Sequence, residues 1–213
     1  MINTKFNDSM ENIEDWKGTM EELRRLEFKT PSSIPEVKLA GSREKLHGVL
    51  EYIVSLEKNP DGTSKQLQWI PEYDAVADWL TDNKGRGLFL FGKPGNGKSL
   101  IARFAIPAIF YRHLSKIVHV YEMNELDTKL DEALTHVFVT LDDIGTETEV
   151  VVYGKRRNAL TELISNAEKN GRMLIVTTNL DGDDIRRIYG EPILDRIKKV
   201  MLPVLFTNPS FRK

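Results

Sequence analysis

The segment that most constrains this chain is Gly92–Ser99, an eight-residue run with the pattern G-x-x-x-x-G-K-S. An apolar run typical of a buried strand, Gly87–Phe91, precedes it and a helical pattern follows it, which is the order that a phosphate-binding P-loop requires. Its glycines let successive N–H groups face the phosphates; Lys98 is expected to reach the β- and γ-phosphates, and the Ser99 hydroxyl to bind Mg²⁺. The residues expected to contact the nucleotide are Gly92, Lys93, Pro94, Gly95, Asn96, Gly97, Lys98, Ser99 and Leu100. A glycine-rich turn that only resembles a P-loop is the weaker alternative, because the strand and the helix flank it in register.

A second apolar run, Val137–Leu141, ends in two acidic residues, Asp142 and Asp143. In open α/β sheets the ligand lies beyond the carboxyl ends of the strands, so both carboxylates are expected to face the P-loop. Asp142 is then the Walker B acid, which holds Mg²⁺ through its water shell together with Ser99. Asp143 is placed to orient or deprotonate the attacking water. A capping or solvated pair of aspartates would be the better interpretation if the P-loop were missing.

Strand-like and helical segments alternate from residue 87 onward. The expected strands are Gly87–Phe91, Ile117–Tyr121, Val137–Leu141, Met173–Thr178 and Val200–Phe206, and the expected helices are Lys98–Arg112, Leu126–Leu134, Asn158–Lys169 and Asp183–Lys199. This alternation predicts an α/β fold with a mostly parallel sheet and helices on both faces. Asn179 follows the fourth strand, where its amide could hydrogen-bond the γ-phosphate or the attacking water. An ordinary turn residue after a strand is an equally good interpretation of Asn179.

The N-terminal part has a different pattern, with two amphipathic helices and a proline- and serine-containing linker, Thr30–Val37, between them. We expect a helical N-terminal region at residues 1–65, available for docking a partner, and an ATPase domain at residues 66–213. The apolar stripe of Trp16, Met20 and Leu23 has no obvious place in the predicted sheet. The alternative is that this stripe, or the apolar face of Leu46–Leu56, packs on the domain as ordinary core.

Composition excludes several classes of function. The chain has no cysteine, so disulfides and thiolate chemistry are excluded. The N-terminus has no apolar signal region and no run reaches the ~20 apolar residues of a membrane span, which predicts a cytoplasmic protein. The net charge is −2, but residues 150–213 carry 12 Lys and Arg against 7 Asp and Glu. That excess is compatible with contact to nucleic acid, although a solvated surface is the simpler interpretation of any one cluster.

The ordered set of motifs resembles the AAA+ ATPases of the DnaC/IstB type, which are bacterial and phage helicase loaders and transposition helper ATPases. The resemblance covers about residues 67–213 and is carried by the P-loop, the acidic pair with Ile144–Glu147, the strand end Thr177–Leu180, and the segments Tyr189–Ile197 and Pro209–Lys213. It implies five parallel strands in the order 5-1-4-3-2, no C-terminal lid, and ATP with Mg²⁺ bound between neighbouring subunits. It also implies that Asn179 is the sensor 1 residue, that Arg196 is the arginine finger acting on a neighbour's γ-phosphate, and that Arg212 is placed like sensor 2.

The resemblance further implies a helicase-loader-like protein of DNA replication that binds ATP and hydrolyses it slowly. The implied partners are a DnaB-like replicative helicase and further copies of this chain, with single-stranded DNA as a further candidate. Two other functions remain open: a transposase-helper ATPase of the IstB type, and a nucleotide-dependent binding module with little hydrolysis. A small-molecule P-loop kinase is weaker, because the short connections leave no room for a lid and an acceptor-binding insert.

Two features depart from the common AAA+ pattern. Asp143 stands where a glutamate is common, and its shorter side chain predicts slow turnover. Only about fifteen residues, Glu122–His136, separate the second and third strands, which argues against an additional DNA-gripping helix there. The basic run Lys155–Arg157 is a candidate contact to a DNA backbone, although a solvated surface explains it at least as well.

Overall fold

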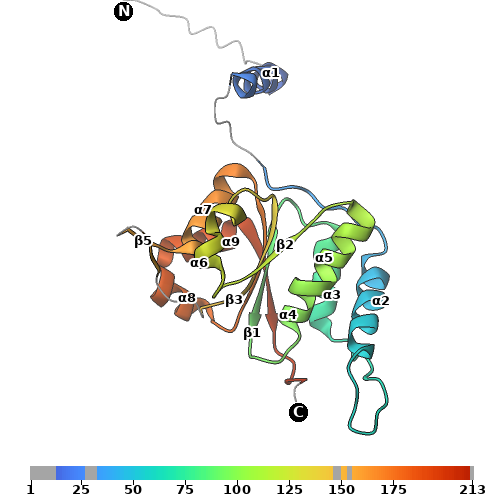
Figure 1. Ribbon diagram of the computed structural model, residues 1–213. Coiled ribbons are helices and arrows are strands. Elements are labelled where there is room, and N and C mark those ends of the chain that lie inside the picture. Colours follow the sequence, from blue (N-terminus) through green and yellow to red (C-terminus); the bar gives the residue numbers. More distant parts are fainter. Residues whose placement is uncertain (1–12, 27–32, 146–149, 153–154, 212–213) are drawn as a thin grey trace, which may run out of the picture. The chain divides into compact units, whose positions relative to one another are not determined.

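The computed structural model describes residues 13–26, 33–145, 150–152 and 155–211, and the chain divides into two units, Met1–Ser32 and Ser33–Lys213. The first unit contains helix α1 (Ile13–Arg25), on which the Trp16 side chain is half exposed (Figure 1). The division therefore falls after Ser32, whereas the sequence suggested a boundary at residue 65. None of the helices in the described part of the chain is long and apolar enough to cross a membrane.

The second unit is built on a five-stranded sheet. Its strands are β1 (Gly87–Gly92), β2 (His119–Glu122), β3 (Phe138–Ile144), β6 (Met173–Thr178) and β7 (Met201–Phe206). They lie in the order β2-β3-β6-β1-β7, and every neighbouring pair is parallel. Counted along the chain within this sheet, the order is 5-1-4-3-2, so the predicted α/β fold and its strand order are confirmed.

A separate two-stranded antiparallel hairpin was not predicted from the sequence. It is formed by β4 (Val150–Val152) and β5 (Lys155–Arg157), directly before the helix that begins at Ala159. The basic run Lys155–Arg157 therefore forms strand β5. Its side chains, like residues 146–149, lie outside the described part of the structure.

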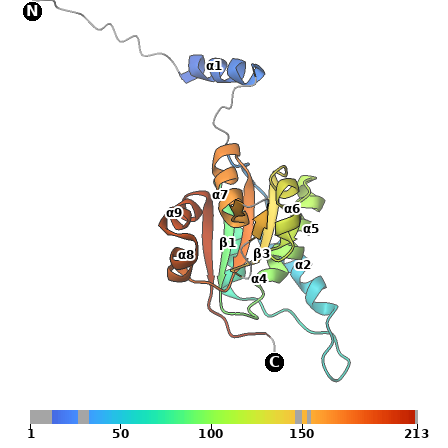
Figure 2. The same cartoon turned by 60° about the vertical axis from the view of Figure 1, so that its left-hand side comes forward.

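Helices cover both faces of the sheet, as predicted (Figure 1; Figure 2). One face carries α2 (Ser42–Ser55), α3 (Pro71–Thr81) and α5 (Ile106–Ile109), and the other carries α6 (Leu126–Ala133), α7 (Ala159–Asn170), α8 (Gly182–Tyr189) and α9 (Glu191–Val200). Successive strand residues point to opposite faces, so Leu88 and Leu90 of β1 enter the first core and Phe89 enters the second. Strand β1, which leads into the P-loop, is thus packed from both sides.

Helix α2 is part of the core of the second unit. Leu46 and Leu50 are completely buried, in the same apolar cluster as Trp79 of α3. Ahead of α2, the Leu39 N–H donates to the carbonyl of Leu80 at 3.1 Å. This is the packing that the sequence left open as an alternative for the second amphipathic helix.

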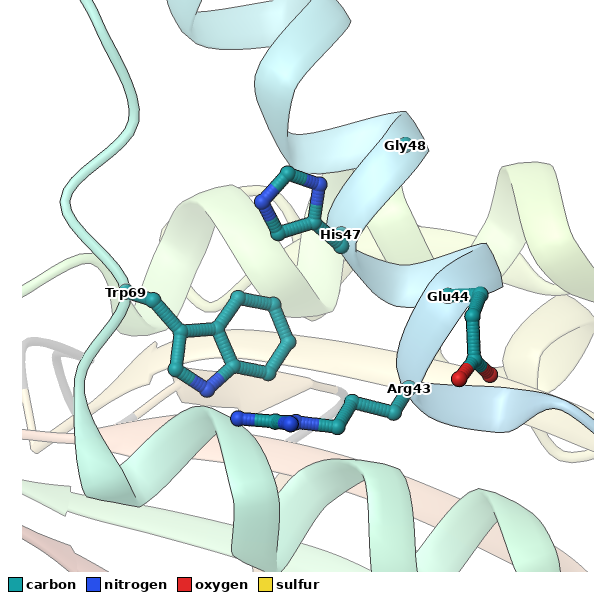
Figure 3. Close-up of a pocket in the computed structure, with 5 residues that line it drawn as sticks. All are labelled: Arg43, Glu44, His47, Gly48 and Trp69. Carbon is teal, nitrogen blue, oxygen red and sulfur yellow. The ribbon is translucent and has the colours of Figure 1, made fainter.

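Side chains around a shallow pocket join α2 to α3 and to the segment before α3. Figure 3 shows Arg43 and His47 directed at the indole of Trp69, which lies just before α3. The Arg43 guanidinium carbon lies 5.3 Å from the centroid of the indole, and the His47 ring stacks on the indole at 5.4 Å. Asp74 accepts hydrogen bonds from both Arg43 Nε (2.8 Å) and Trp69 Nε1 (3.1 Å). One carboxylate therefore joins α2 to the start of α3.

The helix that follows the P-loop, predicted over Lys98–Arg112, contains two π-helical turns. Its successive segments are α4 (Lys98–Leu100), η1 (Ile101–Ala105), α5 and η2 (Phe110–Leu114). Pro107 explains the first irregularity, because proline has no N–H to donate and its ring clashes with the preceding turn. The carbonyl of Ala102, five residues before Pro107, instead accepts the Thr140 hydroxyl of β3 at 3.1 Å. The π-helical turn is thereby fixed against the strand that carries the acidic pair.

Candidate nucleotide-binding site

The P-loop joins β1 to α4 at the carboxyl edge of the sheet. Gly92, Gly95 and Gly97 have φ angles of +134°, +82° and +92°, which other residues rarely adopt. A Cβ atom on Gly92 would lie 2.3 Å from the Phe206 carbonyl oxygen, and one on Gly97 would lie 2.9 Å from the Tyr73 hydroxyl. Only glycine fits these positions, and the result is a tightly curled backbone of the kind that surrounds phosphates.

Lys98 is buried and lies across this loop. Its ammonium group donates hydrogen bonds to the carbonyls of Gly92 (2.8 Å) and Lys93 (2.7 Å) and to Asn179 Oδ1 (3.1 Å). These acceptors are uncharged, so phosphate oxygens would be stronger partners for the same ammonium group. Ser99 follows in the first helical turn and is half-buried. Of the other loop residues, Lys93 and Pro94 are exposed, Asn96 is buried and Leu100 is half-buried.

The acidic pair lies inside β3, which extends three residues beyond the predicted strand end. The pairing of β3 with β6 shifts register between Leu141 and Ile144, and Asp143 has a φ angle of +63°. In a regular strand two consecutive side chains point to opposite faces, and this bulge changes that geometry. A left-handed aspartate is an uncommon conformation of the kind that concentrates at functional sites.

One hydroxyl on β6 holds both acidic residues. Thr177 Oγ1 donates to Asp142 Oδ1 at 2.6 Å and accepts the N–H of Asp143 at 2.8 Å. Asn179 Nδ2 in turn donates to Asp143 Oδ1 at 2.9 Å. Since the Asn179 amide oxygen accepts from Lys98, the structure joins Lys98, Asn179 and Asp143 in one hydrogen-bonded chain, with Asp142 linked through Thr177.

Arg196, one of the two arginines named from the resemblance, makes its contacts outside this network. Arg196 lies on α9, where Nη1 donates to Ser165 Oγ (2.9 Å) and Nε pairs with Glu168 at 3.2 Å. A hydrogen bond from Lys199, with a further contribution from the Arg196 charge, lowers the pKa of the Glu168 carboxyl. Arg196 thus binds an ionised carboxylate on α7 of its own chain. Arg212 lies outside the described residues.

The segment after β7 is fastened to the P-loop. The Phe211 N–H donates to the Gly95 carbonyl at 2.9 Å, and Asn96 Nδ2 donates to the Asn208 carbonyl. At the start of this segment, the buried Glu72 carboxylate accepts from both the N–H and the hydroxyl of Thr207, each at 2.9 Å. Burial alone would raise the pKa of Glu72, but these hydrogen bonds outweigh burial and lower it. The ionised Glu72 therefore holds one end of the segment at Thr207, and the other end contacts the P-loop through Phe211.

Two residues of this site, Thr177 and Arg103, were not expected from the sequence. Thr177 was noted only as a strand end, although a polar residue closing an apolar strand is a recognisable signal. Arg103 of η1 lies 3.4 Å from Asp142 and 2.6 Å from Glu122 at the end of β2. An arginine within the otherwise apolar stretch from Leu100 to Phe110 was the corresponding signal.

Comparison with known proteins identifies an NTPase family and similar folds. The chain matches the family model described as Novel STAND NTPase 3 over residues 70–181, which is more than half of its length. The solved structure of the DnaC helicase loader is 18% identical, with a TM-score of 0.54 over 66% of this chain and 93% of that one. The structure of DnaI is 17% identical, with a TM-score of 0.53 over 80% of this chain and 96% of that one. Among curated proteins none matches this sequence. The predicted resemblance to ATPases of the DnaC type is therefore confirmed at the level of the fold.

Proposed function

The chain belongs to the Novel STAND NTPase 3 family, and we propose that it is an AAA+ ATPase that binds Mg²⁺·ATP at Gly92–Ser99 and hydrolyses it slowly. The observation that carries this proposal is the chain of hydrogen bonds from Lys98 through Asn179 to Asp143. It brings together the P-loop lysine at the start of α4, a polar amide that follows β6 and a carboxylate near the end of β3. A purely structural P-loop would not need this arrangement.

The residues present fit a magnesium ion. Mg²⁺ in nucleotide sites is held by one or two protein groups and by phosphate oxygens, and Ser99 and Asp142 supply the hydroxyl and the carboxylate. When bound, the ion would neutralise charge on the β- and γ-phosphates. Lys98 would bind the same phosphates, and Thr177 would keep the Asp142 carboxylate oriented. Asp143 would accept the proton of the attacking water, which Asn179 would help to position.

We place the function of this ATPase in DNA replication, as a cytoplasmic protein of the helicase-loader kind. The support is the fold shared with the DnaC helicase loader, together with the motifs that carry the resemblance. The proposed partner is a DnaB-like replicative helicase, with single-stranded DNA as a further ligand. Because α2 belongs to the second unit, we assign the docking of the partner to the α1 stripe of Trp16, Met20 and Leu23.

A nucleotide-dependent binding module with little hydrolysis is the second candidate. One observation favours it: the side chain of Asp143 is one methylene shorter than glutamate, and one of its oxygens already accepts from Asn179. A transposase-helper ATPase would use the same site and would differ in its partner. Capture with purified helicase or transposase separates these two partner classes.

Asp143→Asn is expected to lower the turnover of ATP by about 100-fold or more, because an amide cannot take the proton of the attacking water. The amide oxygen can still accept from Asn179, so the affinity for Mg²⁺·ATP should be unchanged. Phosphate release measures the turnover and calorimetry measures the affinity. Asp78→Asn, an exposed position on α3, is the matched control. Equal turnover in the Asp143 variant and the wild type would support the binding-module function.

Arg196→Ala is expected to bind ATP normally and to fail in hydrolysis, if the guanidinium acts on a neighbouring subunit. Mixing it with Lys98→Ala is the sharper test, because an intact P-loop on one subunit then faces an intact Arg196 on the other. Some activity should return in the mixture. No return of activity, while ultracentrifugation shows mixed oligomers, would leave Arg196 with only its contact to Glu168.

A further inference from the structure

Arg103 connects the ends of two neighbouring strands. Its Nη1 atom lies 2.6 Å from Glu122 Oε1 of β2 and 3.4 Å from Asp142 Oδ2 of β3. Glu122 and Asp142 are direct partners in the parallel register of these strands. Two carboxylates side by side repel each other, and the single guanidinium between them offsets that repulsion.

The position of Arg103 follows from the irregular helix. It belongs to the π-helical turn η1, which the bond from Thr140 to Ala102 holds against β3. The arginine is therefore carried by an element fixed to the same strand as Asp142. π-helical turns of this kind are frequent at functional sites.

The two oxygens of Asp142 have different partners. Oδ1 accepts the Thr177 hydroxyl at 2.6 Å, and Oδ2 faces the guanidinium of Arg103. The Asp142 side chain is almost completely buried, whereas Glu122 is partly exposed and forms the shorter contact with the arginine. The Arg103 cation thus lies beside the carboxylate that we assign to Mg²⁺. Its contact with Glu122 is shorter than its contact with Asp142.

We propose that Arg103 and Glu122 are positioning residues that set the Mg²⁺ concentration needed for nucleotide binding, an inference that rests on the proposed Mg²⁺·ATP site. Arg103 opposes the metal by its charge and by occupying Asp142. Glu122 forms the shorter contact with the guanidinium, which weakens the contact of Arg103 with Asp142 and leaves that carboxylate more available to the water shell of the metal. The two residues therefore act on the metal in opposite directions, through the same carboxylate.

The test measures the Mg²⁺ concentration that gives half-maximal binding of an N-methylanthraniloyl derivative of ATP, followed by its fluorescence. Glu122→Gln releases the guanidinium to Asp142 and should raise this concentration by about 8-fold or more, the factor that the Coulomb energy of one charge at this distance gives in water. Arg103→Met removes the competing charge and should lower it by a similar factor. In the double variant, Glu122→Gln should have much less effect than it has in the wild-type background, because the group that it releases is absent.

Two controls change the charge equally without touching the pair. Arg112→Met lies nine residues farther along the same helix, and Glu125→Gln follows β2 in the exposed pair with Lys129. Both should leave the Mg²⁺ requirement unchanged. Binding of the ATP derivative in excess EDTA should be similar in all variants, because the proposed effect acts through the metal.

The possible outcomes are distinct. Shifts of opposite sign for the two single variants, with reduced effect in the double variant, would support the inference. Shifts of the same sign, accompanied by lowered melting temperatures, would show a merely structural ion pair and overturn it. If the wild-type chain does not bind the ATP derivative at any Mg²⁺ concentration, the proposed function itself fails.

Discussion

Lys98→Ala is expected to weaken the binding of Mg²⁺·ATP by at least about 100-fold. The ammonium group is buried, three of its acceptors are neutral carbonyl and amide oxygens, and phosphate oxygens would bind it more strongly. Hydrogen bonds to charged groups contribute about 1.5–3 kcal/mol each, and two such bonds correspond to at least a 100-fold change in Kd. Isothermal calorimetry with Mg²⁺·ATP measures this loss directly.

Thermal melting gives an independent check on the same variant. Ligand at 100 times its Kd stabilises the wild-type fold by about 2.7 kcal/mol, whereas Lys98→Ala should show almost no shift at that concentration. Lys116→Ala removes an equal charge at an exposed position and should behave like the wild type. An affinity within threefold of wild type for Lys98→Ala would mean that Gly92–Ser99 is not the phosphate site.

Removing residues 1–65 is expected to unfold the chain, whereas removing residues 1–32 should leave the second unit folded and able to bind ATP. The longer deletion removes α2 and with it Leu46 and Leu50, both completely buried. Truncating one buried leucine costs about 2–5 kcal/mol, and the net stability of a domain is only about 5–15 kcal/mol. Two leucines together with the Arg43–Asp74 contact therefore approach the whole stability of the fold.

Urea unfolding of point variants separates this effect from a defect of the truncated chain. Leu50→Ala should lower the free energy of unfolding by about 2–5 kcal/mol. Leu56→Ala, at an exposed position just after α2, should change it by less than about 0.5 kcal/mol. The chain lacking residues 1–32 also tests docking, because it should bind ATP and no longer retain the helicase. A soluble chain without residues 1–65 and with an unchanged melting temperature would contradict the assignment of α2 to the core.

The main sheet and the helices that cover it could be predicted well from residue 87 onward, because most of these elements are bounded by their own signals. The glycines of the P-loop and the apolar strands fixed the alternation, and the resemblance supplied the strand order that periodicity cannot give. The place of α2 was not predictable in the same way. An amphipathic helix shows that one face is covered, but its spacing does not say whether α3 of the same chain or another protein covers it.

The site was predictable where residues are close in sequence and less so where distant residues meet. Gly92–Ser99 and the acidic pair are local patterns, and the structure places both at one edge of the sheet. The left-handed conformation of Asp143 depends on a bulge between β3 and β6 and has no local pattern. Arg103 was missed because its partners Glu122 and Asp142 are 19 and 39 positions away, and an arginine on a helix is most often solvated.

The segment after β7 contacts the P-loop, so the conformation of the loop depends on residues near both the middle and the end of the described chain. The Phe211 N–H donates to the Gly95 carbonyl of the loop, and Glu72 holds Thr207 at the start of the same segment. A change that displaces Phe211, such as a rigid fusion partner placed directly after it, would disturb its hydrogen bond with the Gly95 carbonyl. Insertions between Thr207 and Phe211 should consequently be felt as loss of nucleotide affinity, more than a hundred residues away from the motif in sequence.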